Sequence, residues 1–297
     1  MPIRPLVRLL RPKQWTKNFL VFTAFIFTAG WSDPRNGLLV CLAFLSLCLL
    51  SSASYCLNDS LDTESDRLHP KKKLRPIASG EISQGSGLAL ALGCLLAGLG
   101  VSMFLPVGAT VGIAVFGILQ VTYNLFAKRV PILDILWIAI AFVQRAVVGA
   151  LALNVGVSGW LLFCTGTLAL FLASSKRRQE FIALGSDSGT RATLAGYSRA
   201  VVDGLVWMSA GLAIMSYGIY AIESETAKAH PGLILTVPIV FFGVLRYLLI
   251  VFGTTEGEEP ETALFSDPQM VFVLVAFVAT ALCAVADLIP NFVLQRP

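Results

Sequence analysis

Charged side chains are scarce in this sequence, in which Asp, Glu, Lys and Arg together make up only 13% of 297 residues. A soluble globular domain carries about 25% charged residues. Hydrophobic residues make up 56% of the chain, and they are gathered into long runs. The shortage of charge therefore excludes a soluble domain and predicts an integral membrane protein.

Several kinds of chemical site lack the residues that they need. Only two histidines are present, His69 and His230, which is too few for a histidine-based metal site. The six cysteines form no C-x-x-C pair and fall in apolar runs or at their ends, so we interpret them as packing residues. There is also no GxxxxGK[ST] phosphate-binding loop and no GxSxG nucleophile motif.

The apolar runs are long enough to cross a bilayer as helices, for which about 20 residues are needed. Nine such runs predict an all-α, multi-pass membrane protein that forms a single domain over residues 1–297. Some of the runs are short or interrupted by Gly and Pro. The predicted spans are 15–31, 37–57, 86–105, 107–126, 132–153, 158–175, 201–222, 232–252 and 269–290.

Positive charge is distributed unevenly between the segments that join these spans. Of the 22 Lys and Arg residues, 17 fall on the side of the predicted bundle that holds the N-terminus. Cytoplasmic segments carry the excess of Lys and Arg, which predicts a cytoplasmic N-terminus, an outside C-terminus and a bacterial-type cytoplasmic membrane. The polar loops expected at the cytoplasmic face, where the active site would lie, are about 58–85, 127–131, 176–200 and 253–268.

The most informative polar stretch follows the second apolar run and contains Asn58, Asp59, Asp62 and Asp66. Steps of three, four and seven residues keep these side chains on one face of a helix. A basic stretch follows at 69–75. Mg²⁺ takes hard oxygen ligands and usually keeps substrate phosphates in its shell, so the pattern favours a Mg²⁺ site for a phosphorylated substrate over a solvated acidic helix end.

Other polar groups lie where an apolar chain has few reasons to place them. Arg145 and Arg246 fall inside apolar runs, where a charge is costly, so each is expected to face an interior cavity or to form a structural ion pair. The segment 253–261 contains four glutamates and no Lys or Arg. It is expected to pair with a basic loop or help to hold metal, with a solvated acidic loop as the alternative.

The pattern Asn58-Asp59-x-x-Asp62-x-x-x-Asp66, with the hexapeptide at 75–80 after it, resembles the UbiA superfamily of intramembrane prenyltransferases. That resemblance implies nine transmembrane helices around a central cavity, with aspartates that hold Mg²⁺ and a diphosphate. Arg178 and Thr262 depart from the branch that transfers phosphoribosyl groups, which leaves the substrate open. Further pieces that resemble this branch lie at 11–18, 65–80, 123–134, 144–149, 176–180, 245–247 and 257–261.

The resemblance implies a Mg²⁺-dependent transfer of 5-phosphoribosyl from phosphoribosyl pyrophosphate to a decaprenyl-like polyprenyl phosphate, with release of pyrophosphate. It implies Asp59, Asp62 and Asp66 as metal ligands, with Asn58 completing the catalytic set. The residues expected to contact the substrates are Lys17, Arg75, Tyr123, Lys128, Asp134, Arg145, Lys176, Arg177 and Glu180.

Two other functions remain open at this point. A prenyltransferase that moves an isoprenyl group from its diphosphate to a small acceptor would use the same aspartates. A transporter or flippase would use aspartates and buried arginines as an ion path, but the charge here is concentrated at one face and not at the midplane, where transporter sites lie. We expect no nucleic-acid partner, and the sequence leaves a homo-oligomer open.

Overall fold

The computed structural model describes residues 3–28, 30–68, 71–184, 192–253 and 266–289. These residues form helices joined by short connections, and no strand occurs among them. The predicted all-α class is therefore confirmed. The long helices are α3 (Pro34–Leu61), α5 (Gln84–Ser102), α6 (Val107–Leu125), α7 (Leu133–Ala152), α8 (Gly159–Leu184), α9 (Arg199–Glu223), α11 (Val237–Gly253) and α13 (Pro268–Val285).

Seven helical segments in the described part of the chain are long and apolar enough to cross a membrane. They match the predicted spans that begin at residues 37, 86, 107, 132, 201, 232 and 269, so a multi-pass membrane protein is confirmed while a count of nine spans is not. The run predicted at 158–175 lies in α8, which continues to Leu184 because residues 176–180 are Lys, Arg, Gln and Glu, which all favour helix.

The first predicted span, 15–31, is not one continuous α-helix. It consists of the 3-10 helix η1 (Pro12–Phe22), the short helix α2 (Thr23–Phe27) and the 3-10 turn η2 (Gly30–Ser32). A 3-10 helix rises about 2.0 Å per residue, so η1 alone is roughly 22 Å long. A Cβ added at Gly149 of α7 would lie 2.0 Å from the Val21 carbonyl oxygen, so this glycine allows η1 to pack directly against α7.

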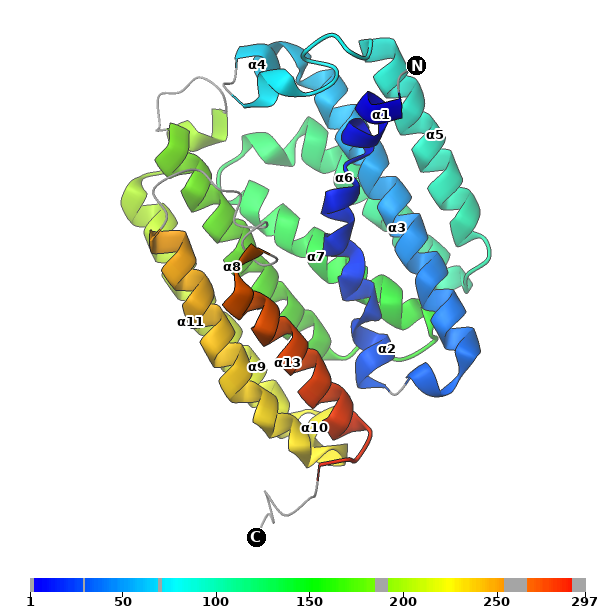
Figure 1. The fold of residues 1–297 in the computed structure, drawn as a ribbon, viewed down its shortest axis with the longest axis vertical. Coiled ribbons are helices and arrows are strands. Elements are labelled where there is room, and N and C mark those ends of the chain that lie inside the picture. The colour runs from blue at the N-terminus through cyan, green and yellow to red at the C-terminus, as the bar shows by residue number, and fades with distance from the viewer. Residues whose placement is uncertain (1–2, 29, 69–70, 185–191, 254–265, 290–297) are drawn as a thin grey trace.

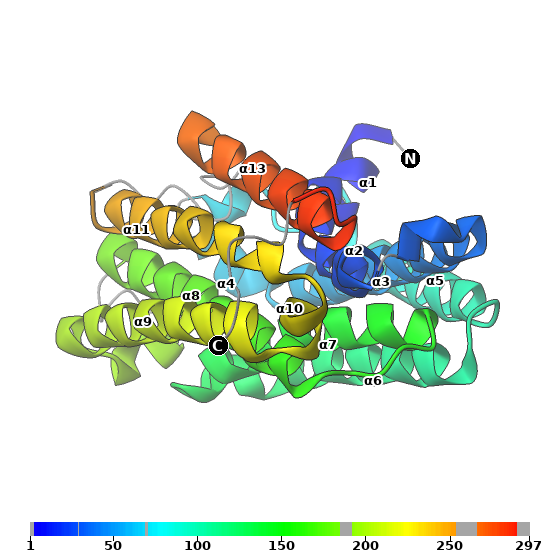
Figure 2. The same cartoon turned by 90° about the horizontal axis from the view of Figure 1, so that it is seen from below.

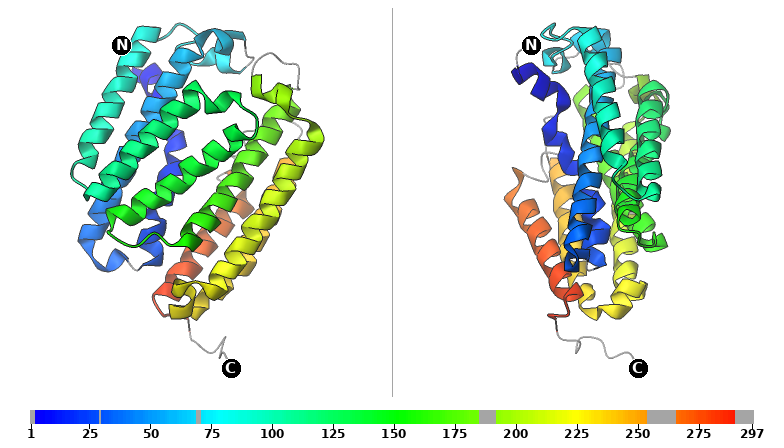
Figure 3. Two further views of the ribbon diagram at one scale, coloured as in Figure 1. Left: turned by 180° about the vertical axis from the view of Figure 1, so that it is seen from behind. Right: turned by 90° about the vertical axis from the view of Figure 1, so that its right-hand side faces the viewer.

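The helices are arranged in two groups that α6 and α7 connect. Figure 1 places η1, α2, α3 and α5 in one half of the molecule and α8, α9, α11 and α13 in the other. Seen from the end that holds the C-terminus, α13 lies beside α2 (Figure 2), and the ring of Phe27 on α2 packs against that of Phe277 on α13. From behind, α7 runs obliquely from one group to the other (Figure 3). A buried cluster that includes Val21, Leu47, Ile113, Phe116 and Val148 joins η1, α3, α6 and α7.

Short helices gather at the two ends of the bundle. The N-terminal helix α1 (Ile3–Leu10) and α4 (Thr63–Leu68) lie at one end, and α10 (Glu225–Ala229) lies at the other, near the C-terminus (Figure 1). The 3-10 turns η3 (Lys72–Leu74) and η4 (Ala127–Arg129) belong to the loops predicted at 58–85 and 127–131. Residues 254–265, and with them most of the predicted acidic loop, lie outside the described residues.

Candidate active site

The aspartates lie where α3 ends and α4 begins. Asp62 is the C-cap of α3, and its N–H donates a hydrogen bond to the Asn58 carbonyl oxygen. The Asp66 N–H donates in turn to the Asp62 carbonyl oxygen over 2.8 Å. Hydrogen bonding of the helical type therefore continues across the junction, and it keeps the predicted acidic face together.

Arg75 joins Asp59 and Asp66, although these carboxylates are two helical turns apart, and Arg11 adds a second cation at Asp59. Arg75 Nη1 donates to Asp59 Oδ1 at 3.1 Å and to Asp66 Oδ2 at 2.6 Å. Arg11 Nη2 donates to both oxygens of Asp59, at 2.7 and 2.9 Å. Both carboxylates are buried, and burial raises the pKa of Asp66 while the charge of Arg75 opposes that shift.

A lysine from the next loop binds the rest of the motif. Lys128 Nζ donates to the two oxygens of Asp62 at 2.7 and 2.8 Å and to Asn58 Oδ1 at 3.1 Å. Asn58 and Asp62 are half-buried and face the η4 turn, which carries Lys128. Three cations from three separate segments thus converge on three carboxylates.

The residues of this cluster fit a hard divalent cation by their chemistry. Carboxylate and amide oxygens are the ligands that Mg²⁺ prefers, and Asp59 and Asp66 already converge on one nitrogen atom of Arg75. No group of three His, Cys, Asp or Glu side chains with metal-binding geometry occurs among the described residues. In this arrangement arginine and lysine nitrogens satisfy the carboxylates. A cation and an anionic substrate would have to divide these contacts with the three basic side chains.

A second, fully buried ion pair lies between α7 and α8. Arg177 pairs with Asp134 and with Glu180, and both Arg177 and Asp134 are at most 2% exposed. The Tyr197 hydroxyl donates to Asp134 Oδ1 at 2.7 Å, and burial raises the pKa of Tyr197. The guanidinium of Arg177 therefore helps to hold α7 against α8. Its predicted contact with substrate phosphate stays a prediction.

The other buried arginines also connect helices. Arg145 Nε donates to Asn18 of η1 at 2.7 Å, and its guanidinium lies over the rings of Phe116 and Phe142. Arg178 Nε donates to Asp203 of α9 at 2.6 Å, and its Nη1 donates to the Val251 carbonyl oxygen of α11. Arg145 thus has polar and aromatic partners inside the bundle, and its contact with substrate stays a prediction.

Arg246, the second arginine inside a predicted span, is half-buried. Its Nη2 donates to Asp267 Oδ2 at 2.6 Å, which ties the middle of α11 to the start of α13. The expectation that it would find a partner is therefore confirmed.

A comparison with known protein families decides how the acidic cluster should be interpreted. The model of the UbiA prenyltransferase family matches residues 19–266. The chain belongs to this family. The resemblance seen in the aspartate motif is therefore confirmed, and so is its implication that the protein is a transferase. That the aspartates and the two basic loops around them form its active site remains a prediction.

Similar proteins are also found by direct sequence comparison. The chain is 31% identical to the decaprenyl-phosphate phosphoribosyltransferase of Corynebacterium glutamicum, over 94% of this chain and 86% of that protein. It is 30% identical to the enzyme of that name from Mycolicibacterium smegmatis, over 93% of this chain and 90% of that protein. These similarities extend over nearly the whole chain.

A solved structure supports the UbiA fold. A UbiA homolog from Archaeoglobus fulgidus, bound to GPP and Mg²⁺, superimposes with a TM-score of 0.73 and 18% sequence identity. The comparison covers 95% of this chain and 99% of that chain. At this level of identity the similarity establishes the fold alone.

Three further residues that are predicted to contact the substrates lie on helices of the bundle. Lys17 lies on η1, Tyr123 lies in the last turn of α6, and Lys176 lies on α8 just before the buried Arg177. All three are half-buried and interact with neighbouring groups. Their contact with substrate remains a prediction.

Two residues of the site were not singled out in the sequence. Arg11 opens the basic segment 11–18, has a backbone φ of 52°, and donates through Nη2 to Asp59. The basic segment was visible, but nothing in it distinguished Arg11 from Lys13 or Lys17. Tyr197 follows the η5 turn (Ala192–Gly196), and no local pattern links it to Asp134, 63 residues away.

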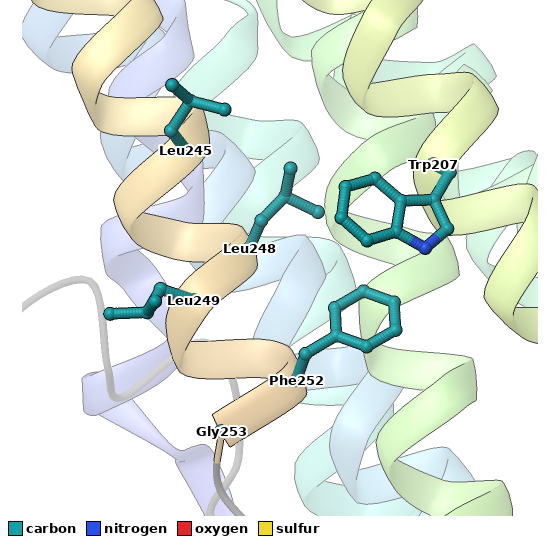
Figure 4. Close-up of a pocket in the computed structure, with 6 residues that line it drawn as sticks. All are labelled: Trp207, Leu245, Leu248, Leu249, Phe252 and Gly253. Carbon is teal, nitrogen blue, oxygen red and sulfur yellow. The ribbon is translucent and has the colours of Figure 1, made fainter.

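Two apolar grooves lie away from the aspartates. One, of about 440 Å³, is lined by Trp207 of α9 and by Leu248 and Phe252 of α11, whose rings and methyl groups face one another in Figure 4. The other, of about 570 Å³, lies between η1, α2 and α13 and includes Phe22, Phe25 and Leu282. Both have the apolar lining that lipid chains require.

Proposed function

We propose that this UbiA-family enzyme transfers 5-phosphoribosyl from phosphoribosyl pyrophosphate to a polyprenyl phosphate in a Mg²⁺-dependent reaction. The observation that carries the proposal is the similarity to two decaprenyl-phosphate phosphoribosyltransferases over more than nine-tenths of the chain. The three basic side chains that reach the aspartates, together with the lysines at 71–73 in the neighbouring loop, agree with it. Phosphoribosyl pyrophosphate has a phosphate on C5 as well as a diphosphate, so it needs more positive charge than an isoprenyl diphosphate does.

The basic side chains would bind and orient the donor. A guanidinium carries five N–H donors, so Arg11 and Arg75 can hold an aspartate and still donate to phosphate oxygens. Lys128 reaches the motif from the η4 turn, through Asp62. A Mg²⁺ ion held by Asp59, Asp62 and Asp66 would neutralise charge on the leaving pyrophosphate.

The acceptor needs little chemical activation. Its phosphate is already an anion, so no strong general base is required, and most of the catalysis can come from orientation and charge neutralisation. Departure of pyrophosphate from C1 of the ribose develops oxocarbenium character, as in other glycosyl transfers. A site at the ends of membrane-spanning helices allows a water-soluble donor and a lipid phosphate to meet at the membrane boundary.

Ligand binding separates this proposal from the isoprenyl alternative. We expect phosphoribosyl pyrophosphate with Mg²⁺ to raise the thermal midpoint of the detergent-solubilised enzyme, because a ligand that binds only the folded state stabilises it. Farnesyl and geranylgeranyl diphosphate should raise the midpoint much less. The prenyltransferase alternative would be favoured if an isoprenyl diphosphate stabilised the enzyme strongly and phosphoribosyl pyrophosphate did not stabilise it at all.

The proposal requires the acidic cluster to face the cytoplasm, which supplies the donor. We expect a cysteine placed at Lys72 in a cysteine-free background to resist an impermeant thiol reagent added outside intact cells. A cysteine at Lys228, which lies on α10 near the other end of the bundle, should react. Labelling at position 72 together with protection at position 228 would show that the protein has the opposite orientation in the membrane, which would contradict the proposal.

A further inference from the structure

The η4 turn and the chain that follows it carry Lys128 to the aspartates, and this backbone is in an unfavourable conformation. Ile132 has a φ of 67°, and a β-branched residue rarely adopts a positive φ. Such a conformation persists only where neighbouring groups hold it. The Ile132 N–H donates to the Tyr197 hydroxyl oxygen at 2.6 Å.

The segment 193–197 holds the same stretch of chain at two further points. Thr193 Oγ1 donates to the Lys128 carbonyl oxygen at 3.1 Å. Gly196 lies against Pro131 so closely that an added Cβ would be 2.4 Å from Pro131 Cγ. The segment 193–197 thus contacts the loop 128–132 at three points, which are Lys128, Pro131 and Ile132.

Tyr197 is itself held firmly. Its hydroxyl accepts from Ile132 and donates to Asp134, which is fully buried and pairs with Arg177 on α8. The hydroxyl has one proton to donate, and that proton is committed to Asp134. Tyr197 therefore transmits the position of the α7–α8 ion pair to the loop that carries Lys128.

We infer that Tyr197, with Thr193 and Gly196, is a positioning group that holds the Lys128 ammonium on Asn58 and Asp62 for pyrophosphate binding. The inference deepens the proposed function, since it assumes that the aspartate cluster binds a diphosphate. The Lys128 side chain is long and flexible, so the position of its backbone decides where its ammonium can reach. Two of the three contacts act on that backbone directly, at Lys128 and Ile132, and the third acts on the Pro131 ring between them.

The test measures binding of inorganic pyrophosphate in the presence of Mg²⁺ by calorimetry on the detergent-solubilised full chain. Pyrophosphate is released in both the phosphoribosyl and the isoprenyl reaction, so the result does not depend on which donor the enzyme uses. Tyr197→Phe keeps the ring and removes only the hydroxyl. We expect it to raise the dissociation constant roughly tenfold, the size of effect that a lost charge-assisted contact produces.

A double-mutant cycle with Lys128→Met shows whether Tyr197 acts through the lysine. If it does, Tyr197→Phe changes the dissociation constant less than twofold in the Lys128→Met background, because coupled residues are not additive. An equal loss in both backgrounds would overturn the inference. So would unchanged affinity with only a lower thermal midpoint, or wild-type enzyme that fails to bind pyrophosphate.

A glycine pair provides an independent variant and a matched control. Gly196→Ala forces Pro131 to shift, and we expect it to weaken pyrophosphate binding about as much as Tyr197→Phe does. Gly204→Ala makes the same chemical change on α9, where an added Cβ would meet nothing within 4 Å. It should leave the affinity unchanged. Equal affinities for the two glycine variants would count against the inference.

Discussion

Asp62→Asn is expected to lower the rate of phosphoribosyl transfer by about two to three orders of magnitude, the typical cost of removing one preorganised electrostatic group. The change keeps the shape of the side chain and removes one carboxylate charge from the Mg²⁺ and donor site. Asp62 is half-buried and pairs with Lys128, so the fold should tolerate the loss. The measurement is incorporation of labelled phosphoribosyl pyrophosphate into polyprenyl phosphate by the purified enzyme.

The control for this variant is Glu64→Gln. Glu64 is an exposed carboxylate in the first turn of α4, two residues away from Asp62. We expect its replacement to leave the rate nearly unchanged. Turnover by Asp62→Asn close to that of the wild type, or activity that a metal chelator does not affect, would contradict the assignment of the aspartates.

Arg177→Ala is expected to destabilise the fold by about 3–5 kcal/mol, because it leaves a buried carboxylate without its partner. That carboxylate is Asp134, which has no exposed surface. Combining Arg177→Met with Asp134→Asn should recover much of the loss, since a buried ion pair can often be replaced by a well-packed neutral pair. The free energy of unfolding is measured by denaturant titration in detergent.

An exposed ion pair provides the comparison for Arg177. The Arg199 side chain is 71% exposed, and its Nε lies 3.7 Å from Asp203 Oδ2. Arg199→Ala should therefore lower the free energy of unfolding by at most about 1 kcal/mol. If Arg177→Ala instead keeps the wild-type stability and weakens donor binding, the original prediction that Arg177 contacts substrate phosphate is right. The structural role described above would then be wrong.

The membrane class and most of the helices follow from the pattern of apolar residues alone. Long apolar runs have one stable outcome in a bilayer, because every backbone N–H and C=O must be satisfied within the segment. The acidic motif was equally visible, because the side chains at 58, 59, 62 and 66 lie on one face of a helix whatever surrounds that helix. The first span was predicted less well, since a 3-10 helix and an α-helix present similar apolar patterns.

Which charges meet depends on how the helices and loops pack together. Arg11 contacts Asp59 across 48 residues of sequence, and Tyr197 contacts Asp134 across 63. Periodicity describes neighbours within one helix, and it carries no information on which loops meet at the end of a bundle. For the same reason Lys176 and Arg177, adjacent in sequence, could not be told apart. One side chain is half-buried, while the other enters the helix interface and pairs with Asp134.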